Sequence, residues 1–104
     1  LLSSARPPTA VFCSCDDLAF HCVMTCYERG LKIPEDMSIC GFDGSGGDLL
    51  EAMRLTTIRQ NYEKIMESAL SLVRDGAPLR PATLLVRPEL VEGRTVAAPG
   101  KKAR

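Results

Sequence analysis

The sequence predicts an α/β domain, a mostly parallel sheet with flanking helices. Three observations support this fold. Short β-branched and aromatic runs alternate with amphipathic helical patterns, one continuous apolar run is typical of a strand buried on both faces, and polar loops follow the strands. The chain has 104 residues, of which 45% are hydrophobic and 25% charged. Such a length and composition fit one globular domain and exclude disordered, collagen-like and coiled-coil chains.

The first half of the chain predicts one strand followed by one helix. The run TAVFC at residues 9–13 is expected to be a strand. A helix is expected over residues 17–29, because Asp16 and Asp17 offer an N-cap and Gly30 a stop. Besides its main apolar face, this helix has a second apolar stripe, made of Phe20, Met24 and Tyr27. A helix that is apolar on two faces usually packs against two partners, of which its own sheet is one.

The second half continues the alternation. The run MSICGF predicts a strand at 37–42, the glycine-rich segment 43–48 a turn, and residues 49–53 a short helix. A third strand is expected at 55–59, an amphipathic helix at 62–75 and a fourth strand, ATLLV, at 82–86. Residues 97–104 are expected to form a flexible tail.

Charge and cysteine content narrow the possible partners and the compartment. Thirteen basic residues balance thirteen acidic ones, which argues against bulk binding of nucleic acid or anionic membranes by this chain. No apolar run approaches the roughly 20 residues of a membrane span, and no signal-peptide pattern is visible. The five cysteines are odd in number and lie in apolar stretches, which favours unpaired thiols in a reducing, cytoplasmic compartment.

Polar side chains collect after three of the predicted strands. Cys15, Asp16 and Asp17 follow the first strand, Asp43 the second, and Gln60, Asn61 and Tyr62 the third. In open parallel sheets ligands bind beyond the carboxyl ends of the strands, so these clusters are expected to meet at one edge. Carboxylates, amides and an aromatic ring together suit a neutral polyhydroxyl or nucleobase-like ligand.

Purely structural roles compete with this interpretation. Asp16 or Asp17 could serve only as a helix cap, Asp43 only as a turn residue, and Gln60 and Asn61 only as the start of the next helix. The cysteines with His21 lack a zinc spacing, so no metal and no cofactor are expected. The single histidine has no obvious orienting acid, so the chain is not expected to be an enzyme.

An ordered series of short motifs resembles the LacI/GalR family of bacterial transcription regulators. The series runs from Pro8-Thr-Ala-Val-Phe-Cys13 with Asp16 and Ala19, through Glu28-Arg-Gly-Leu31 and Ile33-Pro-Glu-Asp36, to Gly41-Phe-Asp43, Leu55-Thr-Thr-Ile-Arg-Gln60 and Pro88-Glu-Leu-Val91. The resemblance covers nearly the whole chain, in order and at the family's spacing. It implies a partial periplasmic-binding-protein-like fold of type I, with all of residues 1–104 in the C-terminal portion of the effector-binding and dimerisation domain.

The family resemblance also implies roles for individual residues. The effector site would include Cys15, Asp16, Asp43, Gln60 and Tyr62, and the outer stripe Phe20, Met24 and Tyr27 would form a homodimer interface. Cys15 departs from the family, which commonly has Asn there, and Gly44 replaces a frequent second Asp. Operator DNA would be bound through a helix-turn-helix headpiece that this chain does not contain. Two apolar surfaces would lack their usual partners, so the chain alone is expected to self-associate.

The resulting prediction is an effector-sensing part of a LacI-type regulator, in which a sugar-like molecule modulates the affinity for operator DNA. Two alternatives remain open at this stage. One is a periplasmic sugar-binding receptor of the same fold, against which the five cysteines argue. The other is a small thiol or metal protein, which a stoichiometric metal or a fast-reacting thiolate would reveal.

Overall fold

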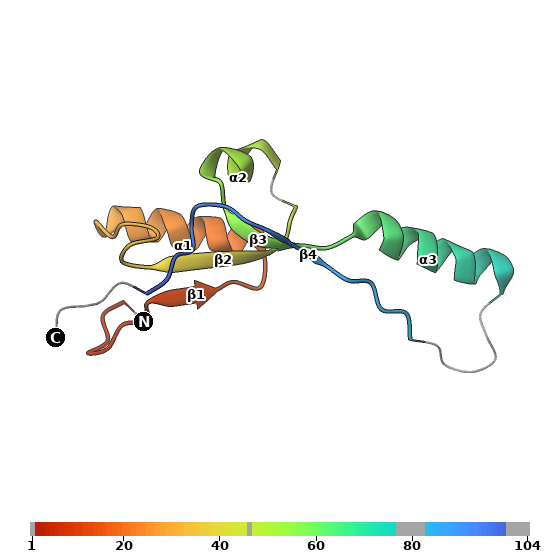
Figure 1. Cartoon of the computed structure of the whole chain (residues 1–104), viewed down its shortest axis with the longest axis horizontal. Helices are drawn as coiled ribbons and strands as arrows, with labels where there is room; N and C mark the ends of the chain where they lie inside the picture. The colour runs from red at the N-terminus through yellow and green to blue at the C-terminus, as the bar shows by residue number, and fades with distance from the viewer. Residues whose placement is uncertain (1, 46, 77–82, 100–104) are drawn as a thin grey trace.

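The computed structural model describes residues 2–45, 47–76 and 83–99. Within these residues the elements follow the order β1 (Ala10–Phe12), α1 (Asp16–Glu28), β2 (Ser38–Asp43), α2 (Gly47–Met53), β3 (Thr56–Arg59), α3 (Tyr62–Asp75) and β4 (Glu89–Val91) (Figure 1). The first three strands and all three helices lie where the sequence predicts them; the bounds of α3 agree and those of the others are shifted by one or two residues.

The four strands form one mixed sheet in the order β1-β2-β3-β4. The pairs β1–β2 and β2–β3 are parallel, and β4 pairs antiparallel with β3. The α/β class with a mostly parallel sheet is therefore confirmed. The three parallel strands end at the same edge, where Asp43 of β2 lies opposite Arg59 of β3.

The fourth strand is the one element that the sequence analysis places wrongly. Residues 83–88 have no regular structure, Ala82 lies outside the described residues, and the strand forms at Glu89–Val91 instead. The reason is pairing. The returning chain meets a partner only where β3 ends, with Glu89 opposite Arg59. The described part of the run ATLLV, residues 83–86, has strand propensity but pairs with none of the described strands. Leu84, Leu85 and Val86 instead line an open cavity together with α3.

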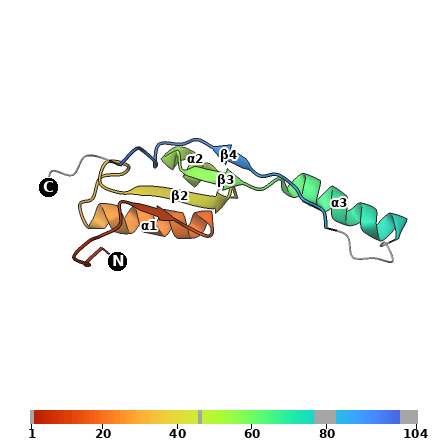
Figure 2. The ribbon, with the colours of Figure 1, turned by 60° about the horizontal axis from the view of Figure 1, so that its bottom comes forward.

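The core lies between α1 and the sheet (Figure 2). Ala19 and Val23 of α1 are 0% and 1% exposed, and Ile39 of β2 is 0% exposed. Cys26, Met37, Leu55 and Cys13 complete the buried cluster. The apolar face predicted for this helix is thus its sheet-facing side.

Helix α3 projects away from this core as an arm (Figures 1 and 2). The described chain extends over 60 × 29 × 20 Å and has a radius of gyration of 18.1 Å. A compact chain of this length would have a radius of gyration of about 13 Å. None of the described residues of α3 is buried. The returning chain segment covers the apolar stripe of α3 only in part. Between the two lies an open groove of about 440 Å³, lined by Ile65, Ser68, Ala69 and Leu72 of α3 and by Leu84, Leu85 and Val86 of the returning segment.

The sheet face opposite α1 also carries partly exposed apolar side chains. Phe42, Ile58 and Leu90 lie side by side across β2, β3 and β4. Phe12 of β1 joins this row, its ring 6.3 Å from that of Phe42 in an edge-to-face arrangement. Phe12 and Leu90 are 63% and 59% exposed. This row and the stripe on α3 are two exposed apolar surfaces, and self-association stays a prediction.

The segment after β4 crosses back over the body. Thr95 is buried, and its hydroxyl donates to the carbonyl of Ile39 and accepts from the amide of Thr56. Ala97 exchanges hydrogen bonds with the Ser38 hydroxyl through its own backbone N–H and C=O. The predicted tail therefore starts with an anchored residue, while residues 100–104 lie outside the described part. In that part, none of the helices has the length and apolar character needed to cross a bilayer.

Candidate functional site

Three of the predicted site residues form one hydrogen-bonded cluster at the carboxyl edge of the sheet. The Gln60 side-chain amide donates to Asp43 Oδ1 at 2.6 Å and to the Tyr62 hydroxyl at 3.3 Å. The backbone closes the same corner, because the Gln60 backbone N–H donates to the Asp43 carbonyl. Asp43 ends β2, Gln60 follows β3, and Tyr62 opens α3. The three polar side chains therefore meet because parallel strands end together.

The Tyr62 hydroxyl is protonated and can therefore donate a hydrogen bond at this edge. Partial desolvation, together with the negative charge of the nearby Asp43 carboxylate, raises the pKa of Tyr62 above its ordinary value of 10.0. The phenol consequently keeps its proton at neutral pH. Asp43 supplies an acceptor, Gln60 both functions, and Tyr62 a ring with a hydroxyl, which is the set that a polyhydroxyl or heterocyclic ligand requires.

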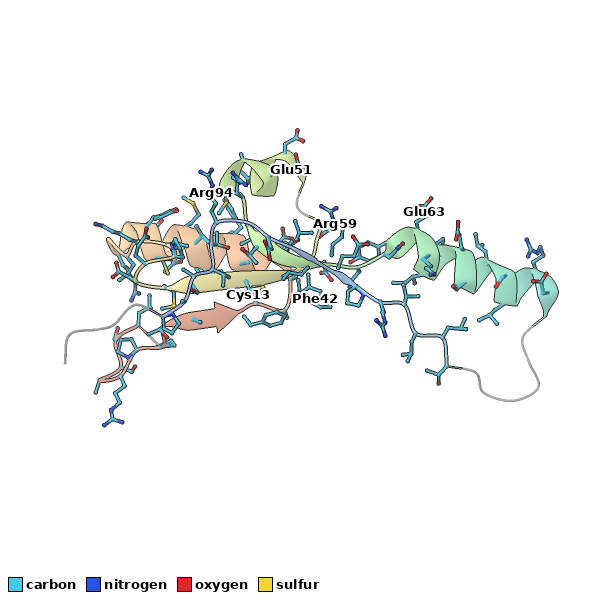
Figure 3. The ribbon with its side chains drawn as sticks, viewed as in Figure 1. Cys13, Phe42, Glu51, Arg59, Glu63 and Arg94 are labelled. Carbon is cyan, nitrogen blue, oxygen red and sulfur yellow. The ribbon has the colours of Figure 1, made fainter. Side chains whose placement is uncertain are left out.

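Two open cavities flank the cluster. The smaller, of about 330 Å³, is lined by Gly44, Arg59, Gln60, Asn61, Tyr62, Glu63 and Glu89. The larger, of about 500 Å³, lies beside α2 and is lined in part by Asp16, Ser45, Glu51, Arg54 and Thr57. Gly44 and Arg59 belong to both. Figure 3 shows Arg59 beside the start of α3, with Glu63 on the first turn of the helix.

Asp16 has a different role from the cap that its position suggests. It lies inside the first turn of α1, and the N-cap is Cys15, which makes no side-chain capping bond. The Asp16 carboxylate is 1% exposed, accepts from the Thr57 hydroxyl at 2.5 Å and accepts from the Ser45 amide at 3.0 Å. The capping alternative is therefore wrong for Asp16. Its carboxylate joins the start of α1 to β3 and to the glycine-rich turn.

Two glycines make this arrangement possible. A Cβ at Gly41 would overlap the Asp16 carboxylate and lie 3.1 Å from Leu55 Cδ2. A side chain at Gly44, whose φ is +68°, would lie 2.7 Å from Arg59 Cβ and Cγ. Gly44 thus brings the backbone against Arg59, and the acid common in the family at this position would not fit here without movement of the strand end.

Cys15, Asn61 and Asp43 differ in how they take part in this edge of the sheet. Cys15 is half-buried between β1 and α1, and lines neither of the two cavities. Asn61 caps α3, its Oδ1 accepting from the Lys64 amide at 2.9 Å, so the helix-start alternative is confirmed for Asn61. Asp43 ends a strand at a φ of +97°, which Asp and Asn tolerate better than other non-glycine residues.

The stripe predicted to be an interface faces away from the sheet. Met24 and Tyr27 are 42% and 55% exposed, and Phe20 is half-buried beside the His21 ring, with ring centroids 5.4 Å apart. The sheet-facing residues of the same helix are fully covered. The two faces predicted from the sequence are thus present, and the outer one has no partner among the described residues.

Arg59, Thr57 and Ser45 are site residues that the sequence analysis does not single out. It places Thr57 only within a strand, although the period-2 position of this residue puts its hydroxyl on the α1 side, within reach of Asp16. Arg59 could have been identified from its position, because it is the last residue of a parallel strand and ligands bind beyond the carboxyl ends of such strands. Ser45 contributes its backbone N–H, so its side chain gives no signal.

The structure offers little support for metal binding by the cysteines. All five thiols are free. Within the ranges 2–45, 47–76 and 83–99, no three side chains of His, Cys, Asp or Glu are placed to share a metal ion. Cys13 and Cys26 instead pack in the core as small apolar groups.

Comparisons with known proteins agree with this geometry. Residues 1–96 match the family described as periplasmic binding protein-like domain. Over 100 residues the chain is 36% identical to the HTH-type transcriptional repressor PurR of Yersinia enterocolitica, covering 93% of this chain but 29% of that protein. The chain therefore spans less than a third of the length of this relative.

Solved structures show the same relationship. A LacI transcriptional regulator from a Rhodococcus species superposes with a TM-score of 0.80 at 28% identity, over 92% of this chain and 36% of that one. The Lac repressor dimer bound to operator and the anti-inducer ONPF gives a TM-score of 0.72 at 27% identity, over 88% of this chain and 32% of that one. The chain therefore belongs to the periplasmic binding protein-like domain family, as part of an effector-binding domain of the LacI/GalR type.

Proposed function

We propose that this chain is the effector-sensing and dimerisation portion of a LacI-type transcription regulator. The observation that carries the proposal is the Asp43–Gln60–Tyr62 cluster at the carboxyl edge of a parallel sheet. The relatives support it, since one is named a transcriptional repressor and another is a repressor dimer bound to operator and an anti-inducer. The periplasmic receptor alternative receives no such support.

The cluster suits a small neutral ligand with several hydroxyl or ring N–H groups. Asp43 accepts hydrogen bonds from the ligand, Gln60 donates and accepts, and Tyr62 presents a half-exposed ring for stacking. Arg59, at the same edge, supplies a cationic donor for a carbonyl or ring oxygen. Asp16 acts behind this surface and fixes the edge through Thr57 and Ser45, whereas Cys15 lines neither cavity.

The outer stripe of α1 is proposed as the homodimer interface. Phe20, Met24 and Tyr27 provide aromatic and methionine side chains, which are enriched in protein interfaces. The intact regulator would contact operator DNA through a headpiece outside these 104 residues and would work in the cytoplasm. Its response is a difference in operator affinity between two conformations, which requires no catalytic step, so the chain is proposed not to be an enzyme.

The first experiment tests the ligand site in the intact regulator. Neutral sugars and nucleobases are titrated by calorimetry, and the tightest ligand is then titrated into the Asp43→Asn variant. Asparagine keeps the backbone conformation and the size of the side chain but removes the charge. We expect affinity to fall by about 10- to 100-fold, since hydrogen bonds to a charged group contribute about 1.5–3 kcal/mol. Operator binding without ligand should be unchanged.

The matched control is Glu35→Gln, which removes a carboxylate at an exposed position away from the edge. This variant should bind the ligand as the wild type does. If Asp43→Asn binds the ligand with unchanged affinity, or if none of the sugars and nucleobases binds the wild type, the proposed site is wrong.

A second experiment tests the interface. Met24→Glu places a charge in the outer stripe of α1 without touching the core, because Met24 is 42% exposed. We expect the dimer dissociation constant to rise at least about tenfold, measured by light scattering over a dilution series. Glu35→Lys, at an exposed position beyond the end of this helix, changes charge outside the stripe and is the control. An unchanged molar mass in Met24→Glu would contradict the assignment.

A further inference from the structure

A pair of thiols lies between the end of β1 and the middle of α1. Cys13 directly follows β1, and Cys22 is on the sheet side of α1. Their sulfurs are 3.8 Å apart, with the Cys13 thiol donating to the Cys22 sulfur. Figure 3 labels Cys13 at this junction. The binding role proposed above uses neither sulfur.

The other three thiols are placed differently. Cys40 donates to the Gly41 carbonyl at 3.4 Å, and Cys26 is packed in the core at 4% exposure. Cys15 is half-buried just before α1, with no hydrogen bond between its sulfur and another among the described residues. Cys13 and Cys22 are therefore the one pair among these five whose sulfurs touch.

We propose that Cys13 and Cys22 are an oxidation site, forming a reversible disulfide when the protein meets hydrogen peroxide. The sulfurs need to approach by about 1.8 Å to reach the bond length of about 2.05 Å. Cys22 is on a helix and Cys13 follows a strand, so the disulfide requires the two side chains to rotate toward each other. The pair is nine residues apart in sequence, which makes the closed loop short.

The chemistry takes two balanced steps. Cys22, the more exposed thiol, reacts first: its sulfur is oxidised to a sulfenic acid by peroxide, which is reduced with release of one water. The Cys13 sulfur then attacks the Cys22 sulfur. The S–O bond breaks, the S–S bond forms, and the Cys13 proton leaves with the hydroxide as a second water. Overall, two thiols and one peroxide give one disulfide and two waters.

The burial of Cys13 assigns the order of these steps. Desolvation, followed by the hydrogen bond with Cys22, raises the pKa of the Cys13 thiol to about 12. A thiol that holds its proton so firmly is a poor first target for peroxide, which reacts with thiolates. Cys13 is assigned the second step because its sulfur already lies 3.8 Å from the Cys22 sulfur that carries the sulfenic acid. A thiol reductant restores both groups, which distinguishes this state from overoxidation.

The disulfide would enclose the residues that shape the ligand edge. The closed loop contains Cys15 and Asp16, and Asp16 holds Thr57 and Ser45. Oxidation would therefore fix the middle of α1 to the end of β1, away from the outer stripe of the helix.

The test treats the full chain with hydrogen peroxide, alkylates the remaining thiols and digests before Asp16 and Asp17 and after Arg29. This digestion separates the fragment with Cys13 and Cys15 from the one with Cys22 and Cys26. We expect three of the five thiols to be alkylated, the two fragments to be linked, and dithiothreitol to restore all five. Cys22→Ser should lose the link, while Cys15→Ser and Cys26→Ser should keep it.

Cys22→Ser is the main variant because Cys22 is only half-buried, and Cys13→Ala then confirms the partner. Alkylation of all five thiols after peroxide treatment would overturn the proposal. So would a link that survives in Cys22→Ser, a link between two chains, or oxidation that dithiothreitol does not reverse. Binding of the regulator's ligand is not measured, so this outcome is independent of the function proposed above.

Discussion

The body of the molecule and its arm are built from similar residues but are stabilised in opposite ways. In the body, α1 buries Ala19 and Val23 against Ile39 of the sheet. In the arm, α3 carries an equally regular apolar stripe, yet Val73 is 82% and Met66 60% exposed. Both helices follow from helical spacing of apolar residues, but one has its partner within the chain and the other does not.

This difference shows that the apolar periodicity of a sequence predicts a helix and its apolar face, but not whether another part of the same chain covers that face. The strong apolar stripe on α3 is a surface suited to a second layer. The returning segment with Leu84, Leu85 and Val86 covers only part of it. We expect this stripe and the Phe12–Phe42–Ile58–Leu90 row of the sheet to be covered in the intact regulator, since exposed apolar surfaces of this kind mark contact sites.

The largest expected effect comes from removing the same atoms in the body and in the arm. Ile39→Ala should lower the free energy of unfolding by about 2–5 kcal/mol, because Ile39 is fully buried in a packed core. Ile65→Ala in α3, where Ile65 is 39% exposed, should cost less than about 1 kcal/mol. Urea unfolding followed by circular dichroism measures both variants. Equal losses would mean that the arm is packed as tightly as the body.

The second prediction concerns stability at alkaline pH, which should depend on thiol ionisation in the body only, because all five cysteines lie there. The pKa of Cys13 rises from its ordinary value of 9.0 to about 12 when the protein folds. Burial also raises the pKa of Cys26 and Cys40. At Cys40 the nearby Asp16 carboxylate raises the pKa further, after the larger effect of desolvation. The arm contains no thiol that could titrate in this range.

These raised pKa values make the folded state less stable at alkaline pH. A thiol whose pKa is higher in the folded state binds its proton more tightly there, so its stabilisation is complete below pH 9 and is lost as the pH rises from 9 towards 12. For Cys13 alone the loss is about 1.4 kcal/mol per pH unit in that window. Urea unfolding at about pH 8 and about pH 10, in the presence of a reductant, should show this decline. Cys13→Ala should show a flatter one, and equal slopes would contradict the buried state of this thiol.

The smallest expected effect is the loss of a helix cap, tested at the starts of α3 and α1. Asn61 caps α3 through the Lys64 amide, whereas Cys15 at the start of α1 makes no capping bond. Asn61→Ala should therefore destabilise the first turn of α3 by about 1 kcal/mol, seen as roughly fivefold faster amide exchange. Cys15→Ala should leave the exchange of α1 nearly unchanged. Similar changes in both helices would show that the Asn61 side chain is not the cap.

Most of the fold could be predicted because local patterns and burial agree in the body. The run MSICGF predicts a strand buried on both faces; β2 is indeed the central strand of the body, but it is covered only on its α1 side, and Phe42 on the other face is half-buried. The helix at 62–75 appears with the predicted bounds, since its apolar stripe, its Asn61 cap and Gly76 all point to the same segment. The strand predicted at 82–86 is wrong because propensity cannot tell whether a pairing partner is within reach.

The geometry of the candidate site could be predicted in part. Asp43, Gln60 and Tyr62 are expected to meet from their positions after parallel strands, and their side chains are hydrogen-bonded to one another. The burial of Asp16 could not be foreseen, because it depends on Thr57 across the sheet and on the space left by Gly41. Local sequence favours a cap at that position, and a contact between residues 41 positions apart overrides it.

The sequence by itself determined the class of the fold, the order of its first three strands and its helices, and the kinds of polar groups available at the edge of the sheet. These follow from periodicity, capping and turn residues, which act over a few neighbouring positions. The tertiary structure alone decided where β4 pairs, that Asp16 is buried rather than capping, that Arg59 joins the edge, and that the stripe of α3 stays largely exposed. Each of these depends on contacts between segments distant in the chain, whose free energy no local pattern contains.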